Sequence, residues 1–319
     1  MAALTKPNAT ASLLENGHGS EHDGVMASRP SISIASRPTH EVSRPPHGIG
    51  AAGSFASRAR PPTDSLPLQG RVAIVTGGSG GIGSAVTTHL ASLGAKVVIG
   101  YIGDPTPANH LVSEINSACT EPGRRAVAVE SDVTDEAQVK LLFDRAQLAF
   151  GPLIHIVVAA AGVQDPNYPP LATTTLAQWE CVFGTNAKGT FLCCREAANR
   201  VVRGGGGRII TMSSSTVGSL RPGYSTYSAS KGAIEVMTRV LAKELRGTGI
   251  TVNGVAPGPI VTALFYRGKS EERIKAIVEE SPLGRLGQPE DVAPVVGFLA
   301  SDAGEWINGQ IIRINGGYV

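Results

Sequence analysis

The sequence has few cysteines, little net charge and no long apolar run, and each shortage argues against a class of protein. Its four cysteines, Cys119, Cys181, Cys193 and Cys194, lack the two-residue spacing that zinc sites use, so we expect free thiols and no metal. A formal net charge of +2 gives no indication of a nucleic-acid partner. The apolar runs are well short of the roughly 20 residues that cross a bilayer, so we expect no membrane partner either.

Residues 1–65 lack hydrophobic periodicity and are rich in Ser, Pro, Gly, Ala and His. Such a segment cannot bury enough apolar surface to offset the entropy of ordering, so it is predicted to be a disordered tail. From Val25 to Pro62 it has five arginines and one acid, Glu41, a composition typical of organellar transit peptides. Two alternatives stay open: a transit peptide of a plastid protein, and a solvated extension of a cytoplasmic one.

From Leu66 onward, short runs rich in Val and Ile alternate with longer segments of helical spacing, which is typical of successive βαβ units. Strands are expected at Arg71–Thr76, Ala95–Gly100, Arg125–Glu130, Ile154–Ala159, Gly207–Met212, Ile250–Ala256 and Gln310–Ile314. Helices are expected at Ile82–Leu93, Asp135–Phe150, Leu176–Val202, Ser225–Arg246 and Pro289–Ala300. Residues 66–319 are therefore predicted to form a single doubly wound α/β Rossmann domain around a seven-stranded parallel sheet.

A glycine-rich segment, Thr76–Gly83, follows the first expected strand and opens the first expected helix. In that position glycines allow a tight turn and a close approach of the backbone to a pyrophosphate, whose charge the helix N-terminus meets. The segment departs from the usual G-x-G-x-x-G spacing and places Gly77, Gly81 and Gly83 in a G-x-x-x-G-x-G frame. This frame resembles the short-chain dehydrogenase/reductase family.

The resemblance extends over Leu66–Val319 through Asp132-Val133, Asn186, Ser214, Tyr227-x-x-x-Lys231 and Pro257-Gly258. The C-terminal residues Asn315–Val319 resemble plant members that reduce aldehydes with NADPH. The resemblance implies a homo-oligomer and a set of cofactor-binding residues: Thr76, Gly77, Ser79, Gly81, Ile82, Gly83, Tyr101, Asp132, Val133, Gly162, Pro257, Gly258 and Thr262. One departure is Ala159-Ala160-Ala161-Gly162, where the family usually has two asparagines, so we expect lost hydrogen bonds to the neighbouring backbone.

The candidate catalytic residues begin with Tyr227 and Lys231, which lie four apart on an expected helix and so share one face. A carbonyl that accepts hydride also needs a proton, and a positive charge beside a phenol helps it to act as the donor. The resemblance implies that Tyr227 is this donor, that Lys231 also binds the nicotinamide ribose, that Ser214 orients the carbonyl, and that Asn186 holds a water near Lys231. Ser213 and Ser215 flank Ser214, so its register stays open.

The second expected strand ends at Gly100 and Tyr101 without the acid that would hold the ribose diol of NAD. This absence favours NADP over NAD. Between Pro259 and Pro282, where the family has its substrate lid, an apolar and partly aromatic segment favours an uncharged hydrophobic carbonyl. We therefore expect NADPH-dependent reduction of a small aldehyde or ketone. The alternatives are NAD-dependent oxidation of an alcohol and a non-catalytic nucleotide-binding protein.

Overall fold

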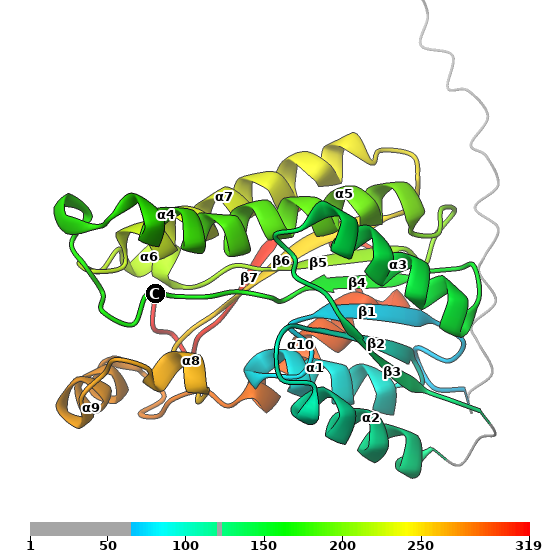
Figure 1. The fold of residues 1–319 in the computed structure, drawn as a ribbon, viewed down its shortest axis with the longest axis horizontal. Coiled ribbons are helices and arrows are strands. Elements are labelled where there is room, and N and C mark those ends of the chain that lie inside the picture. Colours follow the sequence, from blue (N-terminus) through cyan, green and yellow to red (C-terminus); the bar gives the residue numbers. More distant parts are fainter. Residues whose placement is uncertain (1–64, 120–122) are drawn as a thin grey trace, which may run out of the picture. The chain divides into compact units, whose positions relative to one another are not determined.

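The computed structural model describes residues 65–119 and 123–319; the predicted tail, except for Ser65, lies outside them. Seven parallel strands form one sheet in the order β3-β2-β1-β4-β5-β6-β7 (Figure 1). The strands are β1 (Val72–Thr76), β2 (Lys96–Tyr101), β3 (Ala126–Glu130), β4 (Ile156–Ala159), β5 (Arg208–Met212), β6 (Thr251–Pro257) and β7 (Ile311–Ile314). The predicted doubly wound parallel sheet is confirmed.

The central strands are apolar throughout because helices cover both faces of the sheet. Every residue of β1 is buried, and Ile74 pairs with Val98 of β2 and with Val157 of β4. Two apolar clusters lie on the two faces of the sheet, one around Leu90 and the other around Phe143. The alternating direction of side chains along each strand therefore divides the core into two layers.

Helices cover the two faces of the sheet in separate groups (Figure 1). On one face lie α1 (Gly81–Ser92), α2 (Thr106–Ala118) and α10 (Pro289–Ala300); on the other lie α3 (Glu136–Phe150), α4 (Leu176–Phe183), α5 (Gly189–Arg200) and α7 (Ser225–Glu244). Shorter elements are η1 (Leu171–Thr173), η2 (Gly184–Lys188), α6 (Thr216–Ser219), α8 (Ala263–Tyr266), α9 (Glu271–Glu280) and η3 (Asp302–Gly304). No helix in the described ranges is both long and apolar enough to cross a membrane.

The segment predicted as one helix, Leu176–Val202, consists of three elements: α4, the π-helical turn η2 and α5. A π turn inserts where a side chain needs an orientation that the regular helix does not give, and such turns are frequent at functional sites. Here the turn includes Asn186, whose amide group bonds to the backbone of Val163. The tertiary contact explains the break in the helix.

The strand order reverses between β1 and β4, since β2 lies on one side of β1 and β4 on the other. In doubly wound sheets the carboxyl ends of the strands at such a point border the ligand crevice. The glycine-rich turn follows β1 there, and Ala160 and Ala161 follow β4. In Figure 1, α8 and α9 project beyond this same edge of the sheet.

Candidate active site

The turn after β1 lies close against the chain that leaves β4. Gly77 has φ +63°, and a Cβ atom there would lie 2.9 Å from the Cα of Ala161. Gly81 has φ +48°, and a Cβ atom there would lie 3.1 Å from the methyl group of Thr262. Both positions therefore require glycine for conformation and for space. The turn leaves the start of α1 open toward the crevice, a geometry that suits a pyrophosphate.

Thr76 supports the chain where the two family asparagines are missing. Its side-chain oxygen accepts hydrogen bonds from the backbone nitrogens of Ala160 (3.2 Å) and Ala161 (3.3 Å). Thr76 is itself 1% exposed, so these bonds are shielded from water. The expected loss of backbone hydrogen bonds at this loop is therefore offset in part by a threonine at the end of β1.

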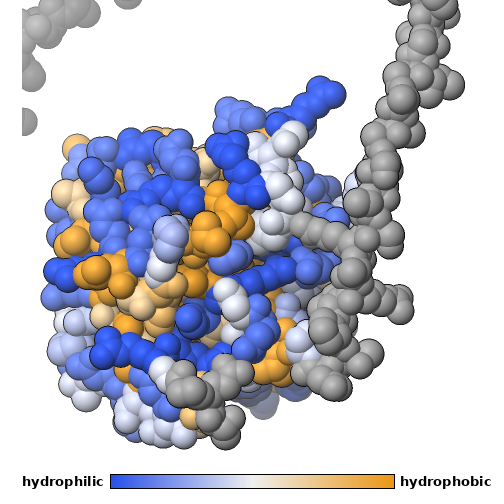
Figure 2. Space-filling view, turned by 90° about the vertical axis from the view of Figure 1, so that its right-hand side faces the viewer, coloured by the Kyte–Doolittle hydropathy of each residue, from blue (hydrophilic) through white to orange (hydrophobic). Residues whose placement is uncertain are grey.

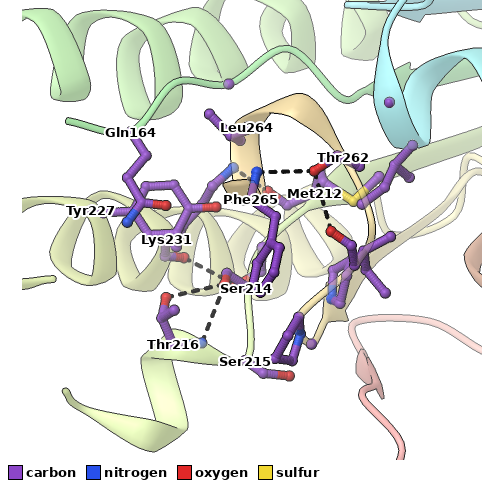
Figure 3. A pocket seen from close by; sticks show the side chains of 18 of the residues that line it. Gln164, Met212, Ser214, Ser215, Thr216, Tyr227, Lys231, Thr262, Leu264 and Phe265 are labelled. Carbon is purple, nitrogen blue, oxygen red and sulfur yellow. Dashed lines mark hydrogen bonds between the residues drawn. The ribbon is translucent and has the colours of Figure 1, made fainter. Parts of the chain in front are cut away.

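Tyr227 and Lys231 lie in the first turns of α7, facing the exit of β5. Lys231 is 3% exposed, and its Nζ donates to the carbonyl oxygen of Met212 at 2.8 Å. The same Nζ lies 5.7 Å from the centre of the Tyr227 ring. The Tyr227 phenol and the Ser214 hydroxyl both line the cavity, and the hydroxyl acts to lower the pKa of the phenol. We call Ser214, Tyr227 and Lys231 the floor of the pocket (Figure 3).

The serines on either side of Ser214 have structural partners. Ser213 donates to Glu235 Oε1 at 3.0 Å, and Ser215 donates to the carbonyl oxygen of Ala256 at 3.0 Å. The Ser214 oxygen accepts from the backbone nitrogen and the hydroxyl of Thr216, at 3.2 and 3.1 Å. Those two donors orient its lone pairs, which leaves its own proton for Tyr227 or a ligand. Of the three serines, Ser214 is therefore the one that faces the pocket with a free donor.

Burial shifts both ionisable groups of the floor toward their neutral forms. It raises the pKa of Tyr227 to about 12, while the hydrogen bond from Ser214 acts in the opposite direction. It lowers the pKa of Lys231 to about 8. At neutral pH Tyr227 therefore keeps its proton, and Lys231 is a charged group close to its titration range.

Asn186 is fully buried in the π-helical turn, and its side chain makes three hydrogen bonds. Its Oδ1 accepts from the Val163 nitrogen (2.8 Å), and its Nδ2 donates to the Val163 oxygen (2.9 Å) and to Ser230 Oγ (3.0 Å). A Cβ atom on Gly162 would lie 3.2 Å from Asn186 Oδ1 and 3.3 Å from Lys231 Nζ. Asn186 thus connects the exit of β4 to α7 beside Lys231.

One cavity of about 360 Å³ joins the glycine-rich turn to the floor. The predicted residues that line it are Gly77, Gly81, Ile82, Gly83, Gly162, Ser214, Tyr227, Lys231, Pro257, Gly258 and Thr262. Six predicted residues do not line it: Thr76, Ser79, Tyr101, Asp132, Val133 and Asn186. Tyr101 and Asp132 lie at the carboxyl ends of β2 and β3, farther along the same edge of the sheet, where an adenosine half of a dinucleotide would extend.

The lid (residues 260–281) closes the cavity opposite the floor, and Figure 3 shows its Leu264 and Phe265 among the lining side chains. Sequence reasoning missed four polar residues of this pocket: Gln164, Thr216, Arg221 and Lys269. Gln164 lies beside Tyr227 in Figure 3, and its Nε2 atom is buried without a hydrogen-bond partner. Lys269 of the lid also lines the cavity. Gln164 follows Gly162 by two residues, a position that a search around the end of the fourth strand would find.

Metal ligands do not gather in the described ranges: no group of three or more His, Cys, Asp or Glu residues is placed to hold an ion. Of the four cysteines, Cys193 and Cys194 are buried and all are free thiols. Burial raises the pKa of Cys194 to about 12, which keeps that thiol in its unreactive protonated form. The ionisable side chains that line the cavity are Arg221, Tyr224, Tyr227, Lys231, Lys269 and Tyr318.

Comparisons with known proteins agree with this geometry. The family model described as "Enoyl-(Acyl carrier protein) reductase" matches residues 77–319. An Arabidopsis thaliana protein named "NADPH-dependent aldehyde reductase-like protein, chloroplastic" is 52% identical over 271 residues, which are 83% of this chain and 99% of that protein. A "Short-chain type dehydrogenase/reductase" of Picea abies is 56% identical over 254 residues, or 79% of this chain and 93% of that protein.

A solved structure of a short-chain dehydrogenase from Burkholderia cenocepacia in complex with NADP is similar to this fold, with a TM-score of 0.72 and 34% identity. The match covers 79% of this chain and 99% of that one. The two proteins are therefore similar in sequence as well as in fold.

Proposed function

This chain belongs to the short-chain dehydrogenase/reductase family of oxidoreductases, and we propose that it reduces an aldehyde or ketone to an alcohol with NADPH. One observation carries the proposal: the glycine-rich turn and the floor line a single cavity. A dinucleotide bound at the turn would reach the floor without leaving that cavity. The volume of about 360 Å³ is within the range of small-molecule sites.

The floor supplies the proton and the orientation for this reaction. NADPH, when bound, supplies the hydride. The Tyr227 phenol donates its proton to the carbonyl oxygen as that oxygen gains negative charge, and the Ser214 hydroxyl donates a hydrogen bond to the same oxygen. Lys231 lies next to the Tyr227 ring, where its charge stabilises the phenolate that remains. Asn186 is a positioning residue, since it is hydrogen-bonded both to Val163, in the segment after β4, and to Ser230, the residue before Lys231 on α7.

The pKa of about 12 at Tyr227 supports the reductive direction. A proton donor must be protonated before the reaction begins, whereas a base for alcohol oxidation must have lost its proton. At neutral pH the buried phenol meets the first condition and not the second. Carbonyl reduction is therefore the direction that the site supports without a change of protonation state.

The choice of NADPH rests on the end of β2. Tyr101 is the last residue of that strand, and the next acid, Asp104, binds the backbone nitrogen of Thr106 at 2.9 Å at the start of α2. No carboxylate of the strand therefore opposes a 2′-phosphate. The name of the Arabidopsis relative mentions NADPH, and the Burkholderia dehydrogenase was solved in complex with NADP, so both relatives agree with this choice.

Steady-state kinetics with NADPH and with NADH over a panel of aldehydes and ketones tests the proposal. We expect a lower KM for NADPH. Tyr101→Asp should shift the preference toward NADH by roughly 10-fold or more, the size of one charged hydrogen-bond pair, and Tyr101→Asn is the uncharged control. Gly100 is less suitable, because a Cβ there would touch Leu142 and Thr76. NADH binding at least as tight as NADPH binding would overturn the cofactor assignment.

We also propose a homo-oligomer, supported by aromatic side chains on the surface. Trp306 is 98% exposed and Phe298 of α10 is 43% exposed, while Trp179 and Phe191 are partly exposed on α4 and α5. The face seen in Figure 2 mixes hydrophobic and hydrophilic residues. Exposed aromatic residues are typical of interfaces. Light scattering after size-exclusion chromatography should give a multiple of 32.9 kDa, and a monomer would contradict the proposal.

For the location in the cell we propose a plastid, with residues 1–65 as transit peptide and residues 66–319 as catalytic domain. The arginine-rich, acid-poor composition of residues 25–62 and the word "chloroplastic" in the name of the Arabidopsis relative support this. Imaging a fluorescent protein fused behind residues 1–65 tests the location, with cytosolic fluorescence as the contrary result. Deleting residues 1–64 should leave activity and melting temperature unchanged.

A further inference from the structure

We propose that the substrate carries a carboxylate in addition to its carbonyl group, and that Lys269 of the lid binds that carboxylate. The inference rests on the proposed carbonyl reduction and narrows its substrate class. It revises the expectation of an uncharged hydrophobic substrate, which considered only the apolar residues of the lid.

The cavity has basic side chains and no acidic ones. Arg221, Lys231 and Lys269 line it, and none of its lining residues is Asp or Glu. Lys231 is part of the floor, where it donates to Met212. Arg221 forms an ion pair with Glu280. Lys269 is thus the basic lining residue that neither an anion nor the reaction accounts for.

Lys269 contacts uncharged groups only. Its Nζ donates to the Tyr168 hydroxyl at 2.5 Å and to the backbone carbonyl oxygen of Phe265. The same Nζ lies 4.7 Å from the centre of the Tyr168 ring and 4.5 Å from the centre of the Phe265 ring. Within residues 65–119 and 123–319, no carboxylate forms an ion pair with it. An ammonium group has three N–H donors, so one remains for a ligand.

A second cation lies next to this group. The Arg273 guanidinium of α9 lies 4.9 Å from the Tyr168 ring centre, on which Lys269 also packs. Burial and the charge of Arg273 lower the pKa of Lys269 to about 8. Lys269 is half-buried and Arg273 is exposed. Their like charges repel each other across the Tyr168 ring, and an anion bound at Lys269 would relieve that repulsion.

Aromatic rings lie beside the ammonium group and along the cavity, and they define the rest of the ligand. The Lys269 ammonium group contacts the Tyr168 and Phe265 rings. Tyr168 packs on Tyr224 with ring centroids 5.0 Å apart, and Tyr224, Phe265 and Tyr318 line the cavity. Flat apolar walls next to a cation favour a planar molecule that ends in an anion. A formylbenzoate has this character, with an aldehyde for the floor and a carboxylate for the lid.

The test compares carbonyl compounds that differ in charge alone. One pair is 4-formylbenzoate and its methyl ester, and a shorter pair is 4-oxobutanoate and its methyl ester, each reduced with NADPH by the full chain. In at least one pair we expect the carboxylate to have a KM roughly 10-fold to 100-fold lower, as one charge-assisted hydrogen bond predicts. That advantage should shrink with added KCl, because the attraction is partly screened.

Variants of the lid separate binding from structure. Lys269→Met should remove the KM advantage of the carboxylate over the ester and leave the KM of the ester unchanged. Lys269→Arg should keep the advantage. Lys275→Met is the matched control, because Lys275 is exposed on α9 and does not line the cavity. If the role of Lys269 is only structural, through its hydrogen bonds to Tyr168 and Phe265, Lys269→Met would raise the KM of the carboxylate and the KM of the ester by the same factor. Equal KM values within both pairs, or the same rise for acid and ester in Lys269→Met, would overturn this inference. Failure to reduce any carbonyl compound, charged or neutral, would instead overturn the proposed function.

Discussion

The floor and the lid of the cavity are built in different ways. The floor lies on the exit of β5 and the 20-residue helix α7, and the lysine that it includes is 3% exposed and hydrogen-bonded. The lid is formed by a four-residue helix and a ten-residue helix, and of α9 only Ile277 is buried. The floor is thus held by the core of the domain, whereas the lid is held by few buried contacts.

This difference suits the floor to the proposed proton transfer and the lid to the choice of substrate. A proton donor and the groups that orient it must keep their geometry within a fraction of an ångström, which a packed strand and helix provide. Segments with few buried contacts open at low free energy, which allows a ligand to enter and leave. We therefore expect substitutions in the floor to change kcat and substitutions in the lid to change KM.

The largest expected effect is that of Tyr227→Phe. The substitution removes the phenol proton and keeps the ring, so kcat should fall by roughly 10²- to 10⁴-fold, the usual contribution of general acid catalysis. Affinity for NADPH should stay within about two-fold, since the ring still packs beside Lys231. Tyr224→Phe is the control, because Tyr224 lines the same cavity. This variant should keep most of the wild-type activity. Turnover by Tyr227→Phe at the wild-type rate would contradict the role of the floor.

The second effect concerns pH and the charge of Lys231. The pKa of about 8 at Lys231 means that its charge is present below pH 8 and is lost above it, so kcat for reduction should fall up to ten-fold for each pH unit above that value. Lys231→Arg keeps its charge over this range, so its lower activity should not show the same decline. The measurement is kcat at saturating NADPH and aldehyde between pH 6 and 10. A flat wild-type profile to pH 10 would show that the charge of Lys231 is dispensable.

In the lid, Phe265→Ala should raise KM and leave kcat nearly unchanged. The ring lines the cavity, and its loss removes apolar surface that a hydrophobic aldehyde covers, worth about 1–2 kcal/mol or roughly 5- to 30-fold in KM. Tyr266→Ala is the control, because Tyr266 is 42% exposed and lies outside the lining. A fall in kcat larger than the rise in KM would mean that the lid takes part in the chemistry.

Much of the fold could be predicted from the sequence because its signals are local. The strand expected at Arg71–Thr76 is β1, one residue shorter, and the helix expected at Pro289–Ala300 is α10. Helix α2 was missed although its buried residues Ala108, Leu111 and Ile115 follow a helical spacing, because they are few among polar residues. The π-helical turn was also missed, because it depends on a hydrogen bond between residues 23 apart.

In the candidate site, too, local patterns could be predicted from the sequence and contacts between distant residues could not. Tyr227 and Lys231 are four apart on one helix, so their convergence follows from helical geometry. The bond between Lys269 and Tyr168 joins residues 101 apart, and no local pattern indicates it. Sequence reasoning therefore found the floor more completely than the lid. The roles of the floor residues stay predictions until the variants above are measured.

The smallest expected effect is on stability, where a substitution in the floor should raise the melting temperature and one in the lid should leave it unchanged. Burial lowers the pKa of Lys231 from 10.5 to about 8, so below pH 8 the folded protein holds a buried charge at a cost of roughly 3 kcal/mol. Lys231→Met removes that cost but leaves the carbonyl oxygen of Met212 without its donor, which costs about 1–3 kcal/mol. A net gain of about 1 kcal/mol would raise the melting temperature by about 2–4 °C at pH 7.

The pH dependence of that gain tests its cause. Between pH 8 and 10.5 the unfolded chain binds more protons at Lys231 than the folded protein does, so wild-type stability should rise with pH relative to Lys231→Met. The difference in melting temperature should therefore shrink from pH 7 to pH 10. Lys275→Met on the exposed side of the lid should show no gain at either pH. A Lys231→Met protein that melts well below the wild type at pH 7 would show that the hydrogen bond to Met212 outweighs the buried charge, and that Lys231 stabilises the floor.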